Sequence, residues 1–140
     1  MQRCPCCNAR LSGDSRCSRC GADLGRVVSC EQLAGEWLSN AWRMMCAKKP
    51  DIAAQAINRS LSFKQTQAAQ VFRQFLVHHQ YRALYEGLAQ QNWQNARQTL
   101  AVLRALHGNN ETLSRFQDLI DFLSVGDAEA VQDWQGRSSL

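Results

Sequence analysis

Two Cys-x-x-Cys pairs near the start of the chain constrain its fold more than any other feature. Cys4 and Cys7 form the first pair, Cys17 and Cys20 form the second, and nine residues separate the two pairs. Two residues between thiolates allow a tight turn that points both sulfurs at one ion, and two such turns complete a tetrahedral site. The four cysteines are therefore predicted to be the ligands of one structural zinc ion, Zn²⁺.

The residues that follow the pairs support this prediction. Asn8 and Gly21 stand directly after the second cysteine of each pair. That position often needs a left-handed backbone, which glycine adopts freely and asparagine tolerates. A four-thiolate site has no open position for water or substrate, so we expect the ion to stabilise the segment and to catalyse nothing.

Another cysteine and other metals are alternatives. Cys6 is an alternative partner for Cys17 and Cys20, but Cys4 and Cys7 have the better spacing. Iron also binds to two Cys-x-x-Cys pairs, and an iron–sulfur cluster is an option because Cys6 supplies a fifth thiol. The separation is short for a rubredoxin-type centre and few aromatic residues lie nearby, so zinc is preferred. The chain has seven cysteines, an odd number that excludes a fully paired disulfide framework. Cys30 and Cys46 are expected to be buried and inert, and Cys6 is the candidate for reactivity.

The wider pattern around the cysteines is shared with a known family. It reads Cys4-Pro5-x-Cys7-x-Ala9-x-Leu11 and then Cys17-x-x-Cys20-Gly21-Ala22-x-Leu24. This resembles the short zinc-ribbon module found at the ends of many bacterial proteins, in which the two halves are equivalent. The family usually has glycine where Asn8 stands. The resemblance implies a zinc-ribbon domain over residues 1–26 and, because such ribbons serve many functions, it does not imply an activity.

The rest of the chain, residues 30–136, is predicted to be a helical domain. Apolar residues recur there at the three- and four-residue spacing of amphipathic helices, and strand alternation is absent. Pro50, Gly108 and Gly126 mark predicted turns. The predicted helices cover residues 30–47, 51–62, 66–90, 93–106, 111–124 and 127–135. Short connections imply antiparallel neighbours, so the predicted fold class is mainly α, a zinc ribbon followed by antiparallel helical hairpins.

Alanines recur near the start of the second helix of each predicted hairpin, and a large apolar residue follows shortly after. This pattern resembles the tetratricopeptide repeat, in which small residues let paired helices approach closely. The first hairpin fits best, with Trp37, Ala41 and Met44 on its first helix and Ala53, Ile57 and Ser60 on its second. The resemblance implies a surface that receives a partner protein. The period is irregular, so an irregular helical bundle is the alternative.

Charge is unevenly distributed along the chain. The formal net charge is +4, and four thiolates with one Zn²⁺ lower it to about +2. Residues 43–104 contain nine Lys or Arg against two acids, whereas residues 105–140 contain two Arg against six acids. A basic surface attracts acidic peptides or polynucleotides. Arg59, Lys64 and Arg73 are the predicted partner-binding residues.

The four tryptophans are candidate anchors for a partner. Trp37, Trp42, Trp93 and Trp134 are numerous for a chain of 140 residues. Most are expected in the core, because aromatic side chains bury a large area where helices cross. One that stays on a concave surface would anchor a peptide instead.

Catalytic motifs are not recognisable in the sequence. It contains no phosphate-binding glycine loop, nucleophile elbow or paired-carboxylate motif, so we expect a non-enzymatic protein. The preferred interpretation is a cytoplasmic adaptor or accessory protein that binds a partner protein through its helical surface. Nucleic-acid binding through the ribbon and the basic residues 43–104 is the alternative, and a redox or metal-handling role is the third. Neither a membrane span nor a secretory signal is apparent, and the sequence does not define the oligomeric state.

Overall fold

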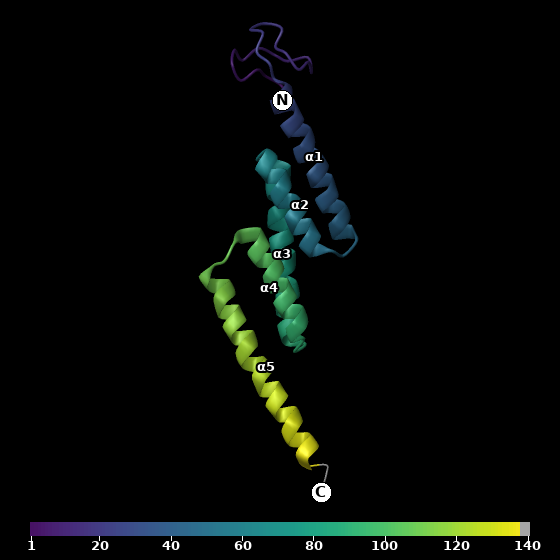
Figure 1. The fold of residues 1–140 in the computed structure, drawn as a ribbon, viewed down its shortest axis with the longest axis vertical. Helices are drawn as coiled ribbons and strands as arrows, with labels where there is room; N and C mark the ends of the chain where they lie inside the picture. Colours follow the sequence, from purple (N-terminus) through teal and green to yellow (C-terminus); the bar gives the residue numbers. More distant parts are fainter. Residues whose placement is uncertain (138–140) are drawn as a thin grey trace. The chain divides into compact units, whose positions relative to one another are not determined.

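Helices make up most of the chain. The computed structural model describes the backbone of residues 1–137 and the side chains of residues 1–126. Within that part of the chain, the helices are α1 (Gly25–Cys46), α2 (Pro50–Phe63), α3 (Gln67–Ala89), α4 (Trp93–His107) and α5 (Glu111–Arg137) (Figure 1). Extended pairing in the described residues is limited to two isolated bridges in the cysteine-rich segment. The predicted mainly α fold class is confirmed.

The chain forms two compact units, and the boundary between them falls inside α3, between Phe72 and Arg73. The first unit contains the cysteine-rich segment, α1, α2 and the first residues of α3. The second contains the remainder of α3, α4 and α5. The predicted domains, residues 1–26 and 30–136, rest on sequence pattern and stay a prediction. Among the described residues, no helix combines the length and the apolar content needed to cross a membrane.

In the first unit, α1 and α2 form an antiparallel hairpin (Figure 1). Ala34 and Ala41 on α1 and Ala53 and Ile57 on α2 are fully or almost fully buried. Small side chains at the alanine positions let the helix axes approach closely. The buried Ser60 hydroxyl then donates a hydrogen bond to the Ala34 carbonyl at 2.7 Å. Burial of the alanines that the sequence pattern singled out in this hairpin is confirmed.

The turn from α1 to α2 is a Schellman motif that lacks glycine. Lys49 N–H donates to Met44 O at 2.9 Å and Lys48 N–H donates to Met45 O at 3.0 Å. Lys48 takes the left-handed conformation that this motif requires, with φ +58°. Pro50 then occupies the first turn of α2, where its missing N–H has no consequence. The predicted helix boundary at this turn is confirmed.

The turn from α3 to α4 repeats this arrangement. Asn92 N–H donates to Gly87 O at 2.9 Å, and Gln91 N–H donates to Leu88 O at 3.1 Å. Gln91 is left-handed, with φ +55°. The Asn92 side chain accepts from Asn95 N–H at 3.1 Å and so caps α4.

The second unit has its own apolar core. Residues from all three of its helices are completely buried there: Leu84, Ala96, Leu100, Leu103, Leu113 and Ile120. Gly87 on α3 faces Ala96 on α4 so closely that a Cβ at Gly87 would lie 3.5 Å from the Ala96 nitrogen. Gly108, with φ +77°, ends α4, and the Asn110 side chain caps α5 through Leu113 N–H at 2.9 Å. The predicted glycine turn between these helices is confirmed.

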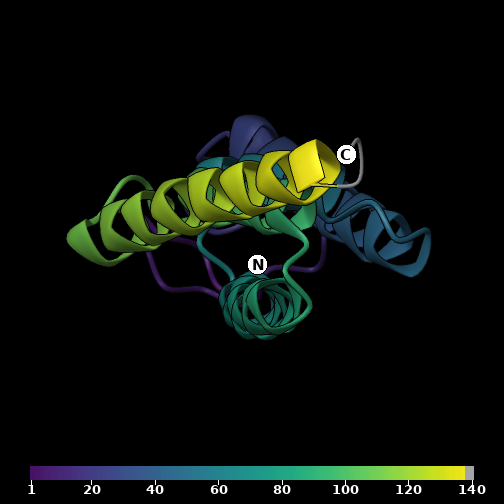
Figure 2. The same ribbon diagram turned by 90° about the horizontal axis from the view of Figure 1, so that it is seen from below.

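Two predicted helix ends differ from the structure. The first helix begins at Gly25 rather than at residue 30, and Asp23 Oδ1 accepts the Gly25 N–H at 2.9 Å. The predicted break at Gly126 is wrong, because α5 runs without interruption from Glu111 to Arg137 (Figures 1 and 2). An isolated glycine lowers helix stability by only about 1 kcal/mol, which does not end a helix by itself.

Candidate metal centre and binding groove

Four cysteines come together at the end of the first unit. The Sγ atoms of Cys4, Cys7, Cys17 and Cys20 all lie within 4.8 Å of one another. The Cys4–Cys20 and Cys7–Cys17 sulfur distances are both 3.7 Å. Tetrahedral coordination with metal–sulfur bonds of about 2.3 Å places ligand sulfurs about 3.8 Å apart. The cluster therefore has the dimensions of a four-thiolate site and can hold a metal ion.

The two halves of the cysteine-rich segment are built alike, with a repeat of thirteen residues. In the first half, Cys4 N–H donates to Ala9 O at 2.8 Å, and in the second, Cys17 N–H donates to Ala22 O at 2.9 Å. Likewise, Asn8 N–H donates to Cys4 O in the first half, and Gly21 N–H donates to Cys17 O in the second. Asn8 has φ +57° and Gly21 has φ +71°. The left-handed backbone predicted at these two positions is confirmed.

One side of the cluster is covered by apolar residues. Cys4, Cys17 and Leu24 are almost completely buried, and Leu11 and Val28 pack against them. Leu24 precedes α1 and Val28 lies in its first turn, so the cysteine-rich segment is packed directly onto the helix. A ligand shell held in this way on one side favours a site that stabilises structure over one that admits a substrate.

Hydrogen bonds and neighbouring sulfurs shift the pKa values of the cluster in opposite directions. The Cys7 N–H stabilises the Cys4 thiolate and lowers the pKa of Cys4 to about 6. The Cys20 N–H lowers the pKa of Cys17 in the same way. The Ala22 N–H lowers the pKa of Cys20, but hydrogen bonding with the Cys7 thiol and burial outweigh it and raise that pKa to about 12. Four thiolates this close repel one another, and a bound divalent cation offsets that repulsion.

The three remaining cysteines stay outside the cluster. Cys6 is exposed, but partial desolvation of its thiolate and then the neighbouring Cys4 raise its thiol pKa, which lowers its reactivity. Cys30 is half-buried. The prediction that Cys46 is buried is wrong, since it is exposed. Cys46 lies about 120° around α1 from the stripe that buries Ala34, so it faces away from α2.

The predicted partner-binding residues are exposed, and two of them already contact other side chains. The Arg59 guanidinium lies 5.4 Å from the centre of the Trp37 ring, a cation–π contact. The Lys64 ammonium pairs with Glu31 of α1. Arg73 belongs to the second unit, whereas Arg59 and Lys64 belong to the first. Binding of a partner by these three residues stays a prediction.

Glu31 links three parts of the first unit. Its carboxylate accepts from the Lys64 ammonium of the segment after α2 and from the Met1 amino group at 2.6 Å. These two donors lower the pKa of Glu31 below its usual value. Sequence reasoning missed this residue, because contacts between positions so far apart along the chain leave no local signal.

An apolar groove lies between α1 and the start of α3 in the first unit. It has a volume of about 460 Å³ and is lined by Leu38, Ser39, Trp42, Arg43, Ala68 and Phe72. The Trp42 side chain is 57% exposed, and its ring meets the Phe72 ring edge-on at 5.9 Å. Trp37 and Trp93 are half-buried, and Trp134 lies outside the described side chains. The sequence named Trp42 among four candidate anchors and did not indicate the groove.

Comparison of this chain with protein-family models, with curated proteins and with solved structures finds no match.

Proposed function

We propose that the four thiolates hold one structural zinc ion in a zinc ribbon, and that the chain is a non-enzymatic adaptor that binds a partner protein at the α1–α3 groove. Four thiolates saturate a tetrahedral ion, so the site offers no position for water or substrate. Iron accepts the same ligands and the same geometry. A colourless preparation with about one zinc per chain supports zinc, and a coloured, iron-containing one contradicts it.

The observation that carries the binding proposal is the exposed Trp42 ring beside the groove. A tryptophan exposed to this extent next to apolar residues is typical of a surface that a partner covers. Tryptophan is also among the residues that contribute most to binding when a partner buries them. The buried Phe72 holds the Trp42 ring from the side, so the anchor is already positioned before binding.

Charge indicates the chemistry of the partner. Residues 1–72 contain ten Lys or Arg and five Asp or Glu, and Arg43 lies in the wall of the groove. We therefore expect a peptide or amphipathic helix with apolar residues for the groove and acidic residues beside them. The closely packed alanines of the α1–α2 hairpin support a tetratricopeptide-like arrangement, in which paired helices present such a surface.

Affinity capture with matched variants tests this proposal. The tagged protein is used to capture partners from its native host after nuclease treatment, alongside Trp42→Ala, Arg43→Glu and Phe122→Ser. Phe122 is the control, because it is an aromatic residue that is 79% exposed on α5, in the other unit.

A protein retained by the wild type and by Phe122→Ser, but lost with Trp42→Ala and weakened with Arg43→Glu, supports the proposal. Retention that Trp42→Ala leaves unchanged contradicts binding at the groove. Loss of every captured protein on nuclease treatment contradicts the adaptor function itself.

A further inference from the structure

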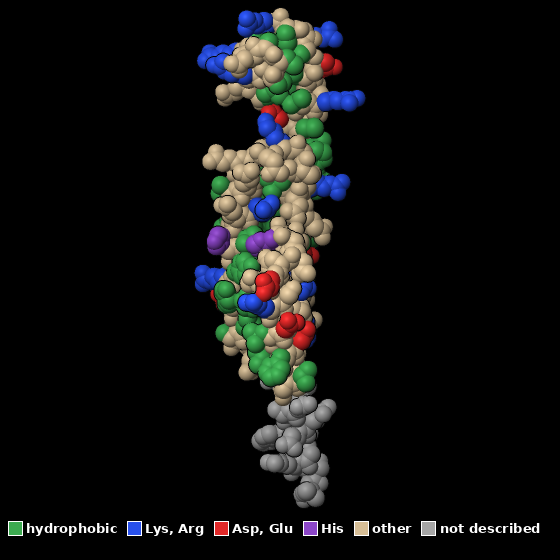
Figure 3. Space-filling view, turned by 90° about the vertical axis from the view of Figure 1, so that its left-hand side faces the viewer, with side chains coloured by type: hydrophobic (Ala, Val, Ile, Leu, Met, Phe, Trp, Pro, Cys, Tyr) green, Lys and Arg blue, Asp and Glu red, His purple; other side chains and the backbone are tan. Residues whose placement is uncertain are grey.

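The cysteine-rich segment carries a group of arginines without acidic partners. The ribbon arginines are Arg3, Arg10, Arg16, Arg19 and Arg26, and all five are exposed. Lys and Arg side chains gather over this segment, which is at the top of the view in Figure 3. Within residues 1–126, where side chains are described, none of the five forms an ion pair. Their charge is therefore available to an outside ligand.

The two equivalent halves of the segment differ in charge at their bridge positions. In the first half Arg3 pairs with Arg10 across an antiparallel bridge, and in the second half Arg16 pairs with Asp23. Like charges directly opposite each other are destabilising, whereas opposite charges are stabilising. The first half therefore has two arginines opposite each other, at the positions where the second half has an arginine opposite an aspartate. An anion beside Arg3 and Arg10 would remove this repulsion.

The acids of the segment do not supply that anion. Asp14 accepts a hydrogen bond from the Ser12 hydroxyl at 3.2 Å, and Asp23 accepts from the Gly25 N–H at 2.9 Å. Arg3 makes only a long contact within the segment, from Nη1 to the Asn8 carbonyl at 3.5 Å.

The composition of the segment favours phosphate as the ligand. All five of its cationic side chains are arginines, whose planar guanidinium binds two phosphate oxygens at once. Residues 1–26 contain no Phe, Trp or Tyr, so no aromatic platform is present there for stacking on unpaired bases. Contacts would therefore go to a phosphate backbone rather than to bases.

We propose that the face of the ribbon carrying Arg3 and Arg10 binds the phosphate backbone of a nucleic-acid duplex. This function is additional to the groove and does not depend on it. Residues 1–26 hold five Arg and two Asp, and a zinc–thiolate cluster lowers their net charge to about +1. The contact is therefore small, at about two or three phosphates. We expect a dissociation constant of about 10⁻⁴ M, at the weak end for non-specific binding, and a slope of log K against log salt of about −2 to −3.

Fluorescence anisotropy of a short labelled DNA duplex with the zinc-loaded full chain tests the proposal. The informative variant is Arg10→Asp, because it gives the first half the Arg–Asp pair that the second half already has, so the ribbon is expected to keep its fold. Lys49→Asp is the control, since it makes the same charge change at the N-cap of α2, where aspartate is favoured. We expect Arg10→Asp to weaken binding about tenfold or more, and Lys49→Asp to weaken it less than about threefold.

Zinc content and circular dichroism show whether Arg10→Asp is folded, and Arg10→Gln replaces it if it is not. A duplex RNA of the same sequence shows which nucleic acid binds better, and binding of either duplex supports the proposal. Equal loss in Arg10→Asp and Lys49→Asp contradicts it, because net charge alone would then explain binding. Tighter binding of the single strand, equal binding of polyglutamate, or no binding of either duplex also overturns it.

Discussion

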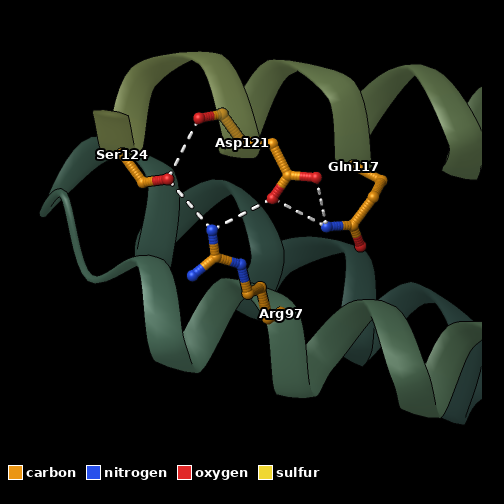
Figure 4. Close-up of polar contacts among 4 residues, drawn as sticks. All are labelled: Arg97, Gln117, Asp121 and Ser124. Carbon is orange, nitrogen blue, oxygen red and sulfur yellow. Dashed lines mark hydrogen bonds and ion pairs between the residues drawn. The ribbon is translucent and has the colours of Figure 1, made fainter. Parts of the chain in front are cut away.

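Arg97 of α4 lies with its Nη2 atom 3.0 Å from Asp121 Oδ1 and 2.9 Å from Ser124 Oγ, both on α5 (Figure 4). The guanidinium donates to both oxygens. Gln117 lies on α5 like Asp121, and its Nε2 donates to both oxygens of the Asp121 carboxylate at 3.0 Å. The Gln117 amide and then the Arg97 guanidinium lower the pKa of Asp121. This group ties α4 to α5 outside their apolar core.

The lowered pKa of Asp121 predicts a pH dependence of stability. Because the pKa of Asp121 is lower in the folded than in the unfolded state, its carboxylate stabilises the fold. This stabilisation is fully present above the unfolded-state pKa of about 3.9 and is lost as pH falls through the folded-state pKa. Urea unfolding of the wild type and of Asp121→Asn, followed by circular dichroism, measures it. We expect the variant to be less stable at pH 7 and the difference to vanish in strong acid.

Asp118→Asn is the matched control, since Asp118 is an exposed acid one turn earlier on α5. It should unfold like the wild type at both pH values. A difference between wild type and Asp121→Asn that stays constant with pH would contradict the ionic contribution.

The cluster of four cysteines was predictable from sequence because all of its determinants are local. The spacing of Cys4 and Cys7 and the need for a left-handed residue after the second cysteine of each pair are properties of a few consecutive residues. The α1–α2 boundary was predictable for the same reason, since Pro50 cannot continue a helix from its preceding turn. The prediction of a helix break at Gly126 was wrong because a lone glycine weakens a helix without ending it.

The groove between α1 and the start of α3 was not predictable, because exposure depends on which helix covers which face. Leu38 and Trp42 have the four-residue spacing of a helix face, and so do Ala68 and Phe72. The same spacing is equally consistent with a buried position and with an exposed one for both pairs. Only the arrangement of α1 and α3 leaves Trp42 57% exposed while Phe72 is 9% exposed.

Gly126 offers a direct test of the unbroken α5. In a continuous helix, Gly126→Ala should stabilise the protein by about 0.5–1 kcal/mol, because alanine loses less backbone entropy and a Cβ there meets nothing within 4 Å among the described residues. Urea unfolding measures the gain. Gly35→Ala, in the middle of α1 and equally free of neighbours, is the control and should give a similar gain. A gain in Gly35→Ala alone would show that the helix ends at Gly126.

Lys48 and Gln91 are in a conformation that favours glycine. Their φ angles are +58° and +55°, and an L-residue with a side chain pays about 1 kcal/mol there relative to glycine. Lys48→Gly and Gln91→Gly should therefore each raise the free energy of unfolding by about 0.5–1 kcal/mol. Gly108→Ala should lower it by more, about 1–3 kcal/mol, because Gly108 has φ +77° and ψ −177°, a region essentially restricted to glycine. Destabilisation by either glycine variant would refute the left-handed assignment.

Ser60 tests the close contact between α1 and α2. Ser60→Ala removes the hydrogen bond to the Ala34 carbonyl and should reduce stability by about 1 kcal/mol. Ser60→Val adds volume where no space exists and should reduce it by about 1–3 kcal/mol. Ser62→Ala, an exposed serine on the same helix, should change stability by less than about 0.5 kcal/mol. If valine were tolerated as well as alanine, the helices would not be in close contact.

Replacement of one clustered cysteine tests whether the fold of the cysteine-rich segment depends on the proposed metal ion. Cys4→Ser and Cys20→Ser should each release the proposed zinc ion and unfold the segment, because metal binding would supply most of the folding free energy of so small a segment. Leu24 and Val28 then lose their apolar contacts, so the first turn of α1 should fray while the remaining helices persist. Metal analysis and circular dichroism measure both effects. Cys6→Ser should retain about one zinc, because Cys6 lies outside the cluster of four sulfurs. A global loss of helix in Cys4→Ser would instead show that α1 depends on the ribbon along its whole length.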